Sequence, residues 1–256
     1  MYFDSSNSKS TIVEFDDYIV LIEAPVKDQG GNATDMKDHS SGGEKILRTL
    51  NNYFPAKSLK YFLHSHWHPH SVSTVNPFLK AGVKVVTTEL NYSVIKKFVD
   101  TAGIKDYNEN LVFVTDSLEI SDNKNKITAY RFTKKDFPNV PNDDYLFFYL
   151  PKQNLMHCAC MYNKWEGDPV DGKEMLTGRE EDLHRFMLSK GIKPEYLIRL
   201  SKEKKEANDM QPFDGLENVV LNGIKGSDIM KGFMETDQKT LDETQDEMLR
   251  DIVKKN

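Results

Sequence analysis

The chain has 256 residues, of which 38% are hydrophobic and 29% are charged, and its net charge at pH 7 is −6. These values are typical of a soluble globular protein, and no apolar run is long enough to span a membrane. The acidic balance and the scattered lysines and arginines also argue against a nucleic-acid backbone, which usually needs a basic patch. We therefore expect neither a membrane nor a nucleic acid as a partner.

The first predicted elements form a β-hairpin that leads into a long loop. Strands are predicted at residues 11–15 and 18–22, with Asp16-Asp17 as the turn between them. The second run is almost entirely apolar, as expected of a strand that is buried on both faces. Residues 25–43 are rich in Gly, Asp, Lys and Ser and predict a long loop.

Short strands and helices then alternate along the chain. Helices are predicted at residues 44–50, 75–80, 92–100 and 180–190, and strands at 61–63, 83–88, 111–114, 126–130, 145–150, 155–161 and 196–200. This order predicts an α/β protein with two sheets whose outer faces are covered by helices.

The C-terminal part of the chain predicts a docked amphipathic helix, because Leu241, Met248, Leu249 and Ile252 fall on one helical face. We see no internal repeat and no linker. The sequence therefore predicts a single domain over residues 1–256, with a core at about 6–201 and a helical extension at about 202–256.

Four of the seven histidines occupy every second position from His64 to His70, directly after the β-prone run at residues 59–63. Imidazole is the commonest protein metal ligand, and ligands at the end of one strand can converge on one ion. This segment is therefore the candidate metal site.

The two cysteines, Cys158 and Cys160, lie two residues apart on a predicted strand, where they would share a face. Such neighbours are poorly placed for an unstrained disulfide, so a disulfide-stapled secreted scaffold is not expected. The first six residues lack a basic segment followed by an apolar one, which predicts a cytoplasmic protein. A signal peptide removed before this sequence begins would leave the same start.

With these motifs, the chain resembles the metallo-β-lactamase superfamily over about residues 6–201. The family's metal motif, Thr/Ser-His-x-His-x-Asp-His after a hydrophobic strand, is similar to Ser65-His66-Trp67-His68-Pro69-His70-Ser71. A rival alignment begins at His64 and places Pro69 where the last histidine belongs.

Two later landmarks support the resemblance. Leu150-Pro151-Lys152 is similar to the end of a family strand, and Cys160 then falls at the position of a family metal ligand. The resemblance implies a four-layer αββα sandwich of the metallo-β-lactamase type, with an additional helical C-terminal segment.

The chain departs from the family's ligand pattern. His70 stands in place of the family's Asp, and Ser71 in place of its next His. Two further histidines would be expected near residues 141–142 and about Ser201, but no histidine follows His184. A family hydrolase uses Zn²⁺ to lower the pKa of a bound water to about 7. The remaining ligands predict that a standard two-zinc site is lost.

Two interpretations of the surviving residues stay open. His66, His68, His70 and Cys160 could form one rearranged Zn²⁺ site, which four protein ligands would close; without Cys160, an open position for water would remain. Alternatively no metal binds, and the histidines form hydrogen bonds while the cysteines pack as small apolar residues. We expect His157 to be packed and Trp67 to lie beneath the site. The expected cofactor is thus none or one zinc ion.

The preferred hypothesis is a metallo-β-lactamase-fold protein that has lost standard hydrolase chemistry and binds a small molecule or a protein partner in its cleft. The alternative is an atypical single-zinc hydrolase that uses His66, His68 and His70, with Cys160 as an optional fourth ligand. The two hypotheses differ in whether stoichiometric zinc is present.

Overall fold

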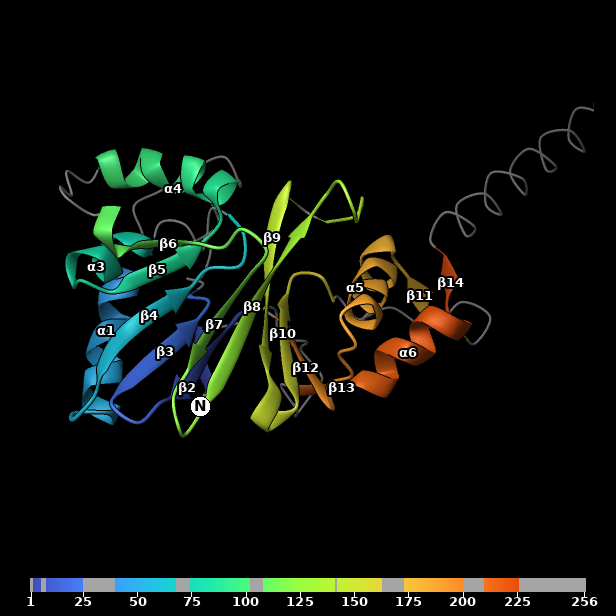
Figure 1. Ribbon diagram of the computed structural model, residues 1–256, viewed down its shortest axis with the longest axis horizontal. Helices are drawn as coiled ribbons and strands as arrows, with labels where there is room; N and C mark the ends of the chain where they lie inside the picture. The colour runs from blue at the N-terminus through green and yellow to red at the C-terminus, as the bar shows by residue number, and fades with distance from the viewer. Residues whose placement is uncertain are drawn as a thin grey trace, which may run out of the picture.

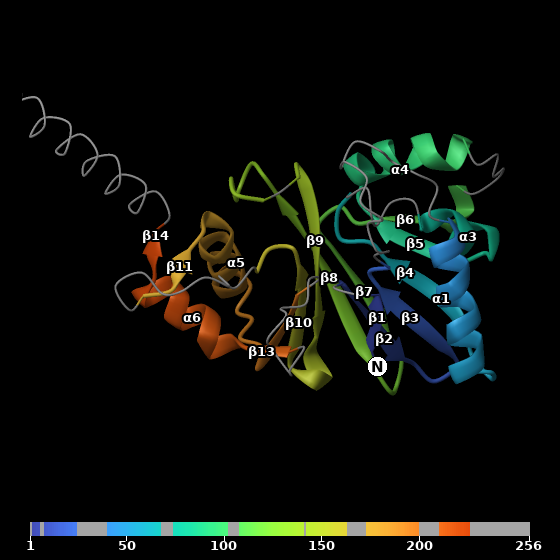
Figure 2. The same cartoon turned by 180° about the vertical axis from the view of Figure 1, so that it is seen from behind.

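Two six-stranded sheets pack face to face between two layers of helices (Figure 1). The structure is a computed structural model, and it describes residues 2–5, 8–24, 40–67, 74–101, 108–140, 142–162, 173–199 and 210–225. The reverse view shows the same order of layers, with α1, α3 and α4 on one side and α5 and α6 on the other (Figure 2). This arrangement confirms the expected αββα sandwich.

The first sheet combines an antiparallel edge with a parallel half. Its strands, in spatial order, are β1 (Tyr2–Ser5), β2 (Ser8–Glu14), β3 (Tyr18–Ile22), β4 (Ser58–Leu63), β5 (Lys84–Thr87) and β6 (Leu111–Phe113). β1, β2 and β3 are antiparallel, whereas β3 to β6 run parallel. Parallel neighbours need crossover connections, and these contain the helices α1 (Ser40–Tyr53), α3 (Val75–Lys80) and α4 (Glu89–Thr101).

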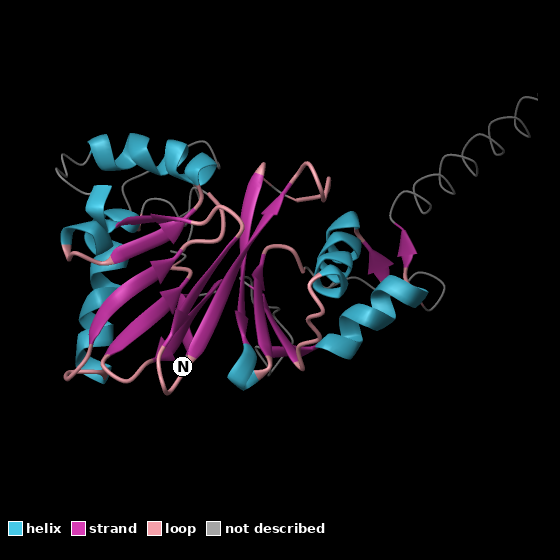
Figure 3. Cartoon of the chain, in the orientation of Figure 1, coloured by secondary structure: helices cyan, strands magenta, loops and turns pink. Residues whose placement is uncertain are grey.

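The second sheet is mostly antiparallel. Its strands, in spatial order, are β13 (Met210–Pro212), β12 (Tyr196–Arg199), β10 (Leu155–Ala159), β9 (Asp144–Leu150), β8 (Lys126–Thr133) and β7 (Ser117–Ser121). Only the pair β10 and β12 is parallel among these. Helices α5 (Gly178–Ser189) and α6 (Phe213–Asn222) cover its outer face, as Figure 3 shows. The short elements are η1 (Asn108–Asn110), η2 (Pro151–Gln153), β11 (Met175–Leu176) and β14 (Ile224–Lys225).

The period of two along each strand separates the core into layers. In β3, Ile19 and Leu21 pack toward the helices, whereas Val20 and Ile22 pack toward the second sheet. In β9, Phe147 packs against α5 while Phe148 lies between the sheets. A strand buried on both faces must be apolar at every position, which explains the nearly continuous apolar runs in the sequence.

Several elements differ from the sequence-based expectation. Helix α1 begins at Ser40, inside the predicted loop of residues 25–43, and therefore includes Gly42 and Gly43. The close packing of α1 on α3 explains the glycine, because a Cβ at Gly43 would lie only 2.8 Å from the Thr74 carbonyl oxygen.

Other elements whose apolar signal is short are not predicted by the sequence. These are β1, β7 and β13, whereas α6, between β13 and β14, falls within the helical extension predicted at about 202–256. β13 pairs with β12, and α6 packs beside α5, so both belong to the layers of the second sheet. The predicted helix around Leu241–Ile252 lies outside the described residues. Within the described ranges, no helix is both long and apolar enough to span a membrane.

Phe186 anchors α5 to the second sheet. Its buried ring lies 5.0 Å from the ring of Phe132 and 5.1 Å from that of Phe147, measured between centroids. We expect Phe186→Ala to lower the free energy of unfolding by about 3–5 kcal/mol, through lost contacts and an unfilled cavity. Leu188→Ala on the same helix is the control, because Leu188 is exposed and its truncation should change stability by less than about 0.5 kcal/mol. Urea denaturation compares the two, and equal effects would contradict this account of the helix.

Candidate functional site

The histidine segment begins where β4 ends, and it joins the two sheets. The backbone N–H of His64 donates to the Val86 carbonyl at 3.0 Å, which continues the pairing of β4 with β5. One residue later, the Ser65 carbonyl accepts a hydrogen bond from the Leu146 N–H of β9 at 2.8 Å. The segment therefore crosses from one sheet to the other. We call this end of the sandwich, formed by Glu23, residues 64–67, Tyr145 and Cys160, the histidine edge.

His66 is held in a single orientation. Its side chain is almost fully buried, its Nδ1 lies 2.7 Å from Ser65 Oγ, and its ring stacks on Tyr145 with the centroids 4.4 Å apart. A hydrogen bond to one ring nitrogen and a packed ring face are the usual means by which a protein orients a metal-binding imidazole. The same contacts also suit a histidine that only packs, so this geometry serves both interpretations.

Tyr145 connects His66 to Cys160. The Cys160 N–H donates to the Tyr145 hydroxyl at 2.7 Å, and that hydroxyl donates to the Cys158 carbonyl at 3.2 Å. β10 ends at Ala159, whose φ of 44° turns the chain away from the sheet. Cys160 therefore lies just beyond the strand, and the expectation that it shares a strand face with Cys158 is wrong. Both cysteines are free thiols.

The environment of Cys160 keeps its thiol protonated. Burial raises the pKa of Cys160 to about 12, and the nearby Glu23 carboxylate adds to this rise while Arg179 opposes it. The thiolate is the form that binds metals and acts as a nucleophile. Cys160 is thus a poor ligand unless a metal ion displaces its proton.

Glu23 is part of the site although the sequence analysis did not select it. It follows β3 with a φ of 58°, is fully buried, and accepts a hydrogen bond from the Ser65 N–H through Oε1 at 2.6 Å. Its second oxygen, Oε2, has no hydrogen-bond partner among the described residues. Burial raises the pKa of Glu23 to about 7. The sequence feature that could have identified Glu23 is its position, as an acidic residue directly after the apolar run at residues 18–22.

The structure brings only part of the predicted ligand set together. His66 and Cys160 both contact Tyr145, whereas His68 and His70 lie outside the described residues. Within the described ranges, no group of three His, Cys, Asp or Glu side chains could hold a metal ion. The predicted zinc ligands therefore remain a prediction.

Other residues near the predicted ligand positions have structural contacts. Asn142, near the position of a family histidine, donates through Nδ2 to the Trp67 carbonyl at 2.7 Å. Trp67 is 38% exposed, so it does not lie beneath the site as expected. His157 is fully buried in β10, as predicted, and its ring centroid lies 6.2 Å from that of Phe148. Ser201 lies outside the described residues.

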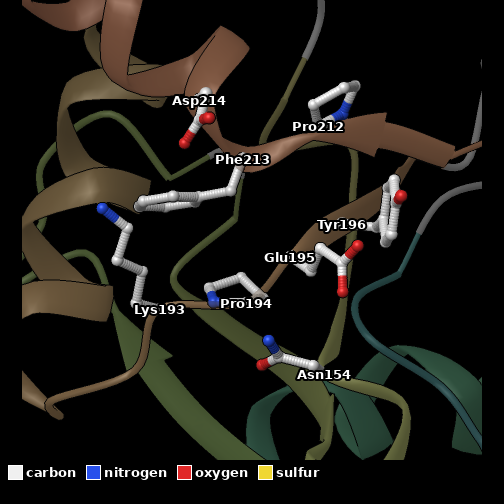
Figure 4. A pocket seen from close by; sticks show the side chains of 8 residues that line it. All are labelled: Asn154, Lys193, Pro194, Glu195, Tyr196, Pro212, Phe213 and Asp214. Atoms are coloured by element: carbon white, nitrogen blue, oxygen red, sulfur yellow. The ribbon is translucent and has the colours of Figure 1, made fainter.

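A surface cavity of about 490 Å³ lies at the other end of the second sheet, where β10 and β12 begin (Figure 4). Its lining residues are Asn154, Lys193, Pro194, Glu195, Tyr196, Pro212, Phe213 and Asp214. Lys193 Nζ lies over the Phe213 ring and 3.3 Å from a Glu217 carboxylate oxygen. The described lining contains no histidine or cysteine, so this cavity offers none of the chemistry of the histidine edge.

Comparison with solved structures identifies the architecture. A metallo-β-lactamase from Pontibacter korlensis matches the chain with a TM-score of 0.57 at 17% sequence identity, covering 86% of this chain and 90% of the other. A metallo-β-lactamase from Hirschia baltica matches with a TM-score of 0.53 at 14% identity, covering 84% of each chain. The chain has the metallo-β-lactamase fold.

The likeness to metallo-β-lactamases is one of fold. No protein-family model matches the sequence, and no curated protein sequence matches it. The fold places the histidine edge where β4 ends and β9 begins, but at these identities the site has to be judged from its own residues.

The raised pKa of Glu23 predicts a specific dependence of stability on pH. The folded protein keeps the Glu23 proton up to about pH 7, whereas an unperturbed glutamate loses it near 4.5. Between these values the folded state binds more protons than the unfolded state, so the free energy of unfolding falls as the pH rises. Glu23→Gln lacks this titration, so we expect its stability relative to the unmodified protein to rise by roughly 2–3 kcal/mol from pH 5 to pH 8.

Urea denaturation at several pH values measures this difference. Glu14→Gln is the control, because Lys57 lowers the pKa of Glu14 and its carboxylate stays ionised across this range. The Glu14→Gln difference should therefore be constant from pH 5 to pH 8. Parallel profiles for Glu23→Gln and the unmodified protein would mean that Glu23 is already ionised in the folded protein at pH 5.

Proposed function

We propose that this protein uses the metallo-β-lactamase fold as a binding scaffold, and that a small molecule or a partner protein binds at the histidine edge. The proposal is supported by the few side chains of the second sheet that could bind a metal ion at this edge. Among its described residues at this edge, Asp144 is bound by Arg131 and the pKa of the Cys160 thiol is raised to about 12, so neither binds zinc readily. A two-zinc hydrolase needs ligands from both sheets.

The residues do not fit a pair of zinc ions. Each ion needs three or four ligands, and neutral imidazoles and thiolates are the preferred ones. Asn142 stands near one family histidine position, and its amide already binds the Trp67 carbonyl. No histidine follows His184 in the sequence, so none can occupy the last family position. We therefore do not expect this chain to hydrolyse a substrate with two zinc ions.

One observation favours a second candidate, an atypical single-zinc hydrolase. Ser65 Oγ holds Nδ1 of His66, so a metal ion would bind through Nε2 of a ring that is already oriented. His66, His68 and His70 would then hold one zinc ion, with Cys160 as an optional fourth ligand. Such an ion would lower the pKa of a bound water when one position stays open. His68 and His70 would have to converge on His66 for this to occur.

Zinc content separates the two candidates. The proposal predicts far less than one zinc per chain in protein purified without an affinity tag, measured by elemental mass spectrometry, both before and after incubation with Zn²⁺. His66→Ala and His68→Ala should leave the zinc content unchanged. His184→Ala is the matched control, because His184 lies on α5 beside Glu217, away from the histidine edge.

The opposite result has a clear signature. About one zinc per chain that is lost in His66→Ala and His68→Ala, but kept in His184→Ala, would contradict the proposal and favour the single-zinc site. Ester and thioester cleavage by the same variants would then decide whether the site is catalytic. A circular-dichroism spectrum of each variant shows that loss of zinc is not loss of fold.

A further inference from the structure

A second cavity opens between the two sheets, beside β2 of the first sheet and β10, β12 and β13 of the second. It has a volume of about 380 Å³, and its lining residues are Thr11, Ile12, Val13, Glu14, Lys124, Asn125, Leu150, Gln153, Leu155, Ile198 and Met210. We call it the inter-sheet cavity. β9 begins at the histidine edge with Asp144 and reaches the cavity with Leu150, about 20 Å further along the strand. Thr11, at the other side of the cavity, pairs with Ile22, the residue before Glu23 of the histidine edge. Sites for small molecules commonly have volumes of about 300–1,000 Å³.

The walls of the inter-sheet cavity are aliphatic. Val13, Leu150, Leu155 and Ile198 belong to the core between the sheets and are at least nine-tenths buried. Met210, from the edge strand β13, is 37% exposed at the same cavity. The cavity therefore suits an aliphatic molecule that enters between the sheets.

Thr11 is the polar exception in this wall. It pairs with Ile22 across the sheet and lies two residues before Val13, so it faces the second sheet as both of those residues do. Its side chain is 6% exposed, and its hydroxyl has no hydrogen-bond partner among the described residues. A buried hydroxyl without a partner costs folding free energy, and valine would fill the same space without that cost. A ligand oxygen in the cavity would supply the partner.

The two charged residues that line the cavity, Glu14 and Lys124, pair with each other. Glu14 binds Lys57 at 2.8 Å and Lys124 at 3.2 Å, while its backbone carbonyl accepts a hydrogen bond from the Asn125 amide at 2.6 Å. Gln153 in turn donates to Asn125 Oδ1 at 2.7 Å. Because Glu14 and Lys124 already form an ion pair, neither of them is an unpaired counter-charge for a ligand. An ionised ligand would lose its hydration without gaining a counter-charge.

We propose that the inter-sheet cavity is a second binding site, for an uncharged, mainly aliphatic molecule with one oxygen that hydrogen-bonds to the Thr11 hydroxyl. The aliphatic part contacts Leu150, Leu155 and Ile198, and the oxygen lies against Thr11. This site is independent of the proposed function at the histidine edge, since the two share no residue.

The test uses 1-octanol as the probe and the complete chain as the protein. Titration followed by ¹H–¹⁵N correlation spectra should shift amide signals of β2, β10 and β12. Thr11→Val keeps the shape of the side chain and removes the hydroxyl, so binding of 1-octanol should weaken about three- to tenfold. Thr11→Ser keeps the hydroxyl and should bind within about twofold of the unmodified protein. Octanoate and octylammonium, which carry a charge at pH 7, should bind more weakly than 1-octanol.

Thr87→Val is the matched control. Thr87 is also a buried threonine of the first sheet whose hydroxyl has no partner among the described residues, but it does not line the cavity. Its substitution should leave 1-octanol binding unchanged. The proposal is overturned if 1-octanol does not bind, if the shifted signals lie elsewhere, if Thr11→Val binds as tightly as the unmodified protein, or if octanoate binds equally well. Thermal melting of Thr11→Val, which should be at least as stable, separates lost binding from lost fold.

Discussion

The junction at Ser65 is the interaction on which the histidine edge depends. Its N–H donates to the Glu23 carboxylate, its carbonyl accepts from the Leu146 N–H, and its hydroxyl lies within hydrogen-bond distance of His66. Ser65 is fully buried, and buried backbone groups must find partners inside the protein. The partners come from β3 and β9, which belong to different sheets. This junction therefore fixes both the relative position of the sheets at this edge and the orientation of His66.

Burial at this junction also governs its chemistry. Away from water the charged forms of Glu23 and Cys160 are disfavoured, so the pKa of each group is raised. A zinc ion bound here would have to displace the thiol proton of Cys160 and would find few nitrogen ligands on the second sheet. The chain thus has the metallo-β-lactamase fold, while the side chains at this junction favour uncharged groups. This contrast between the fold and the chemistry of the junction underlies the proposal of a binding scaffold.

The inter-sheet cavity shows a different balance of the same forces. At the histidine edge the polar groups of Ser65 are satisfied by the protein itself, which makes the junction rigid. In the inter-sheet cavity, Thr11 places a hydroxyl among aliphatic side chains and finds no partner among the described residues. A ligand gains binding free energy when it supplies the hydrogen-bond partner that such a buried polar group lacks. The histidine edge and the inter-sheet cavity therefore offer sites of different character.

The sequence by itself determined most of the strands, four of the helices in part, and the fold. Period-two alternation and buried apolar runs such as residues 18–22 and 145–150 predict two facing sheets covered by helices. The short elements β7 and β13 were not predicted, because their strand character depends on pairing with neighbours and not on their own residues. His66 was selected from the spacing of the histidines and from the resemblance to the family's metal motif, and Cys160 from the family ligand position on which it falls.

Only the tertiary structure decided which groups lie beside His66 and Cys160. Glu23 lies 42 residues from Ser65 in the chain and Tyr145 lies 79 from His66, and no local pattern predicts contacts at such separations. The raised pKa values, and the lack of a hydrogen-bond partner for the Thr11 hydroxyl among the described residues, likewise result from burial. Burial is a property of the packed sheets, because it depends on what every neighbouring element removes from water.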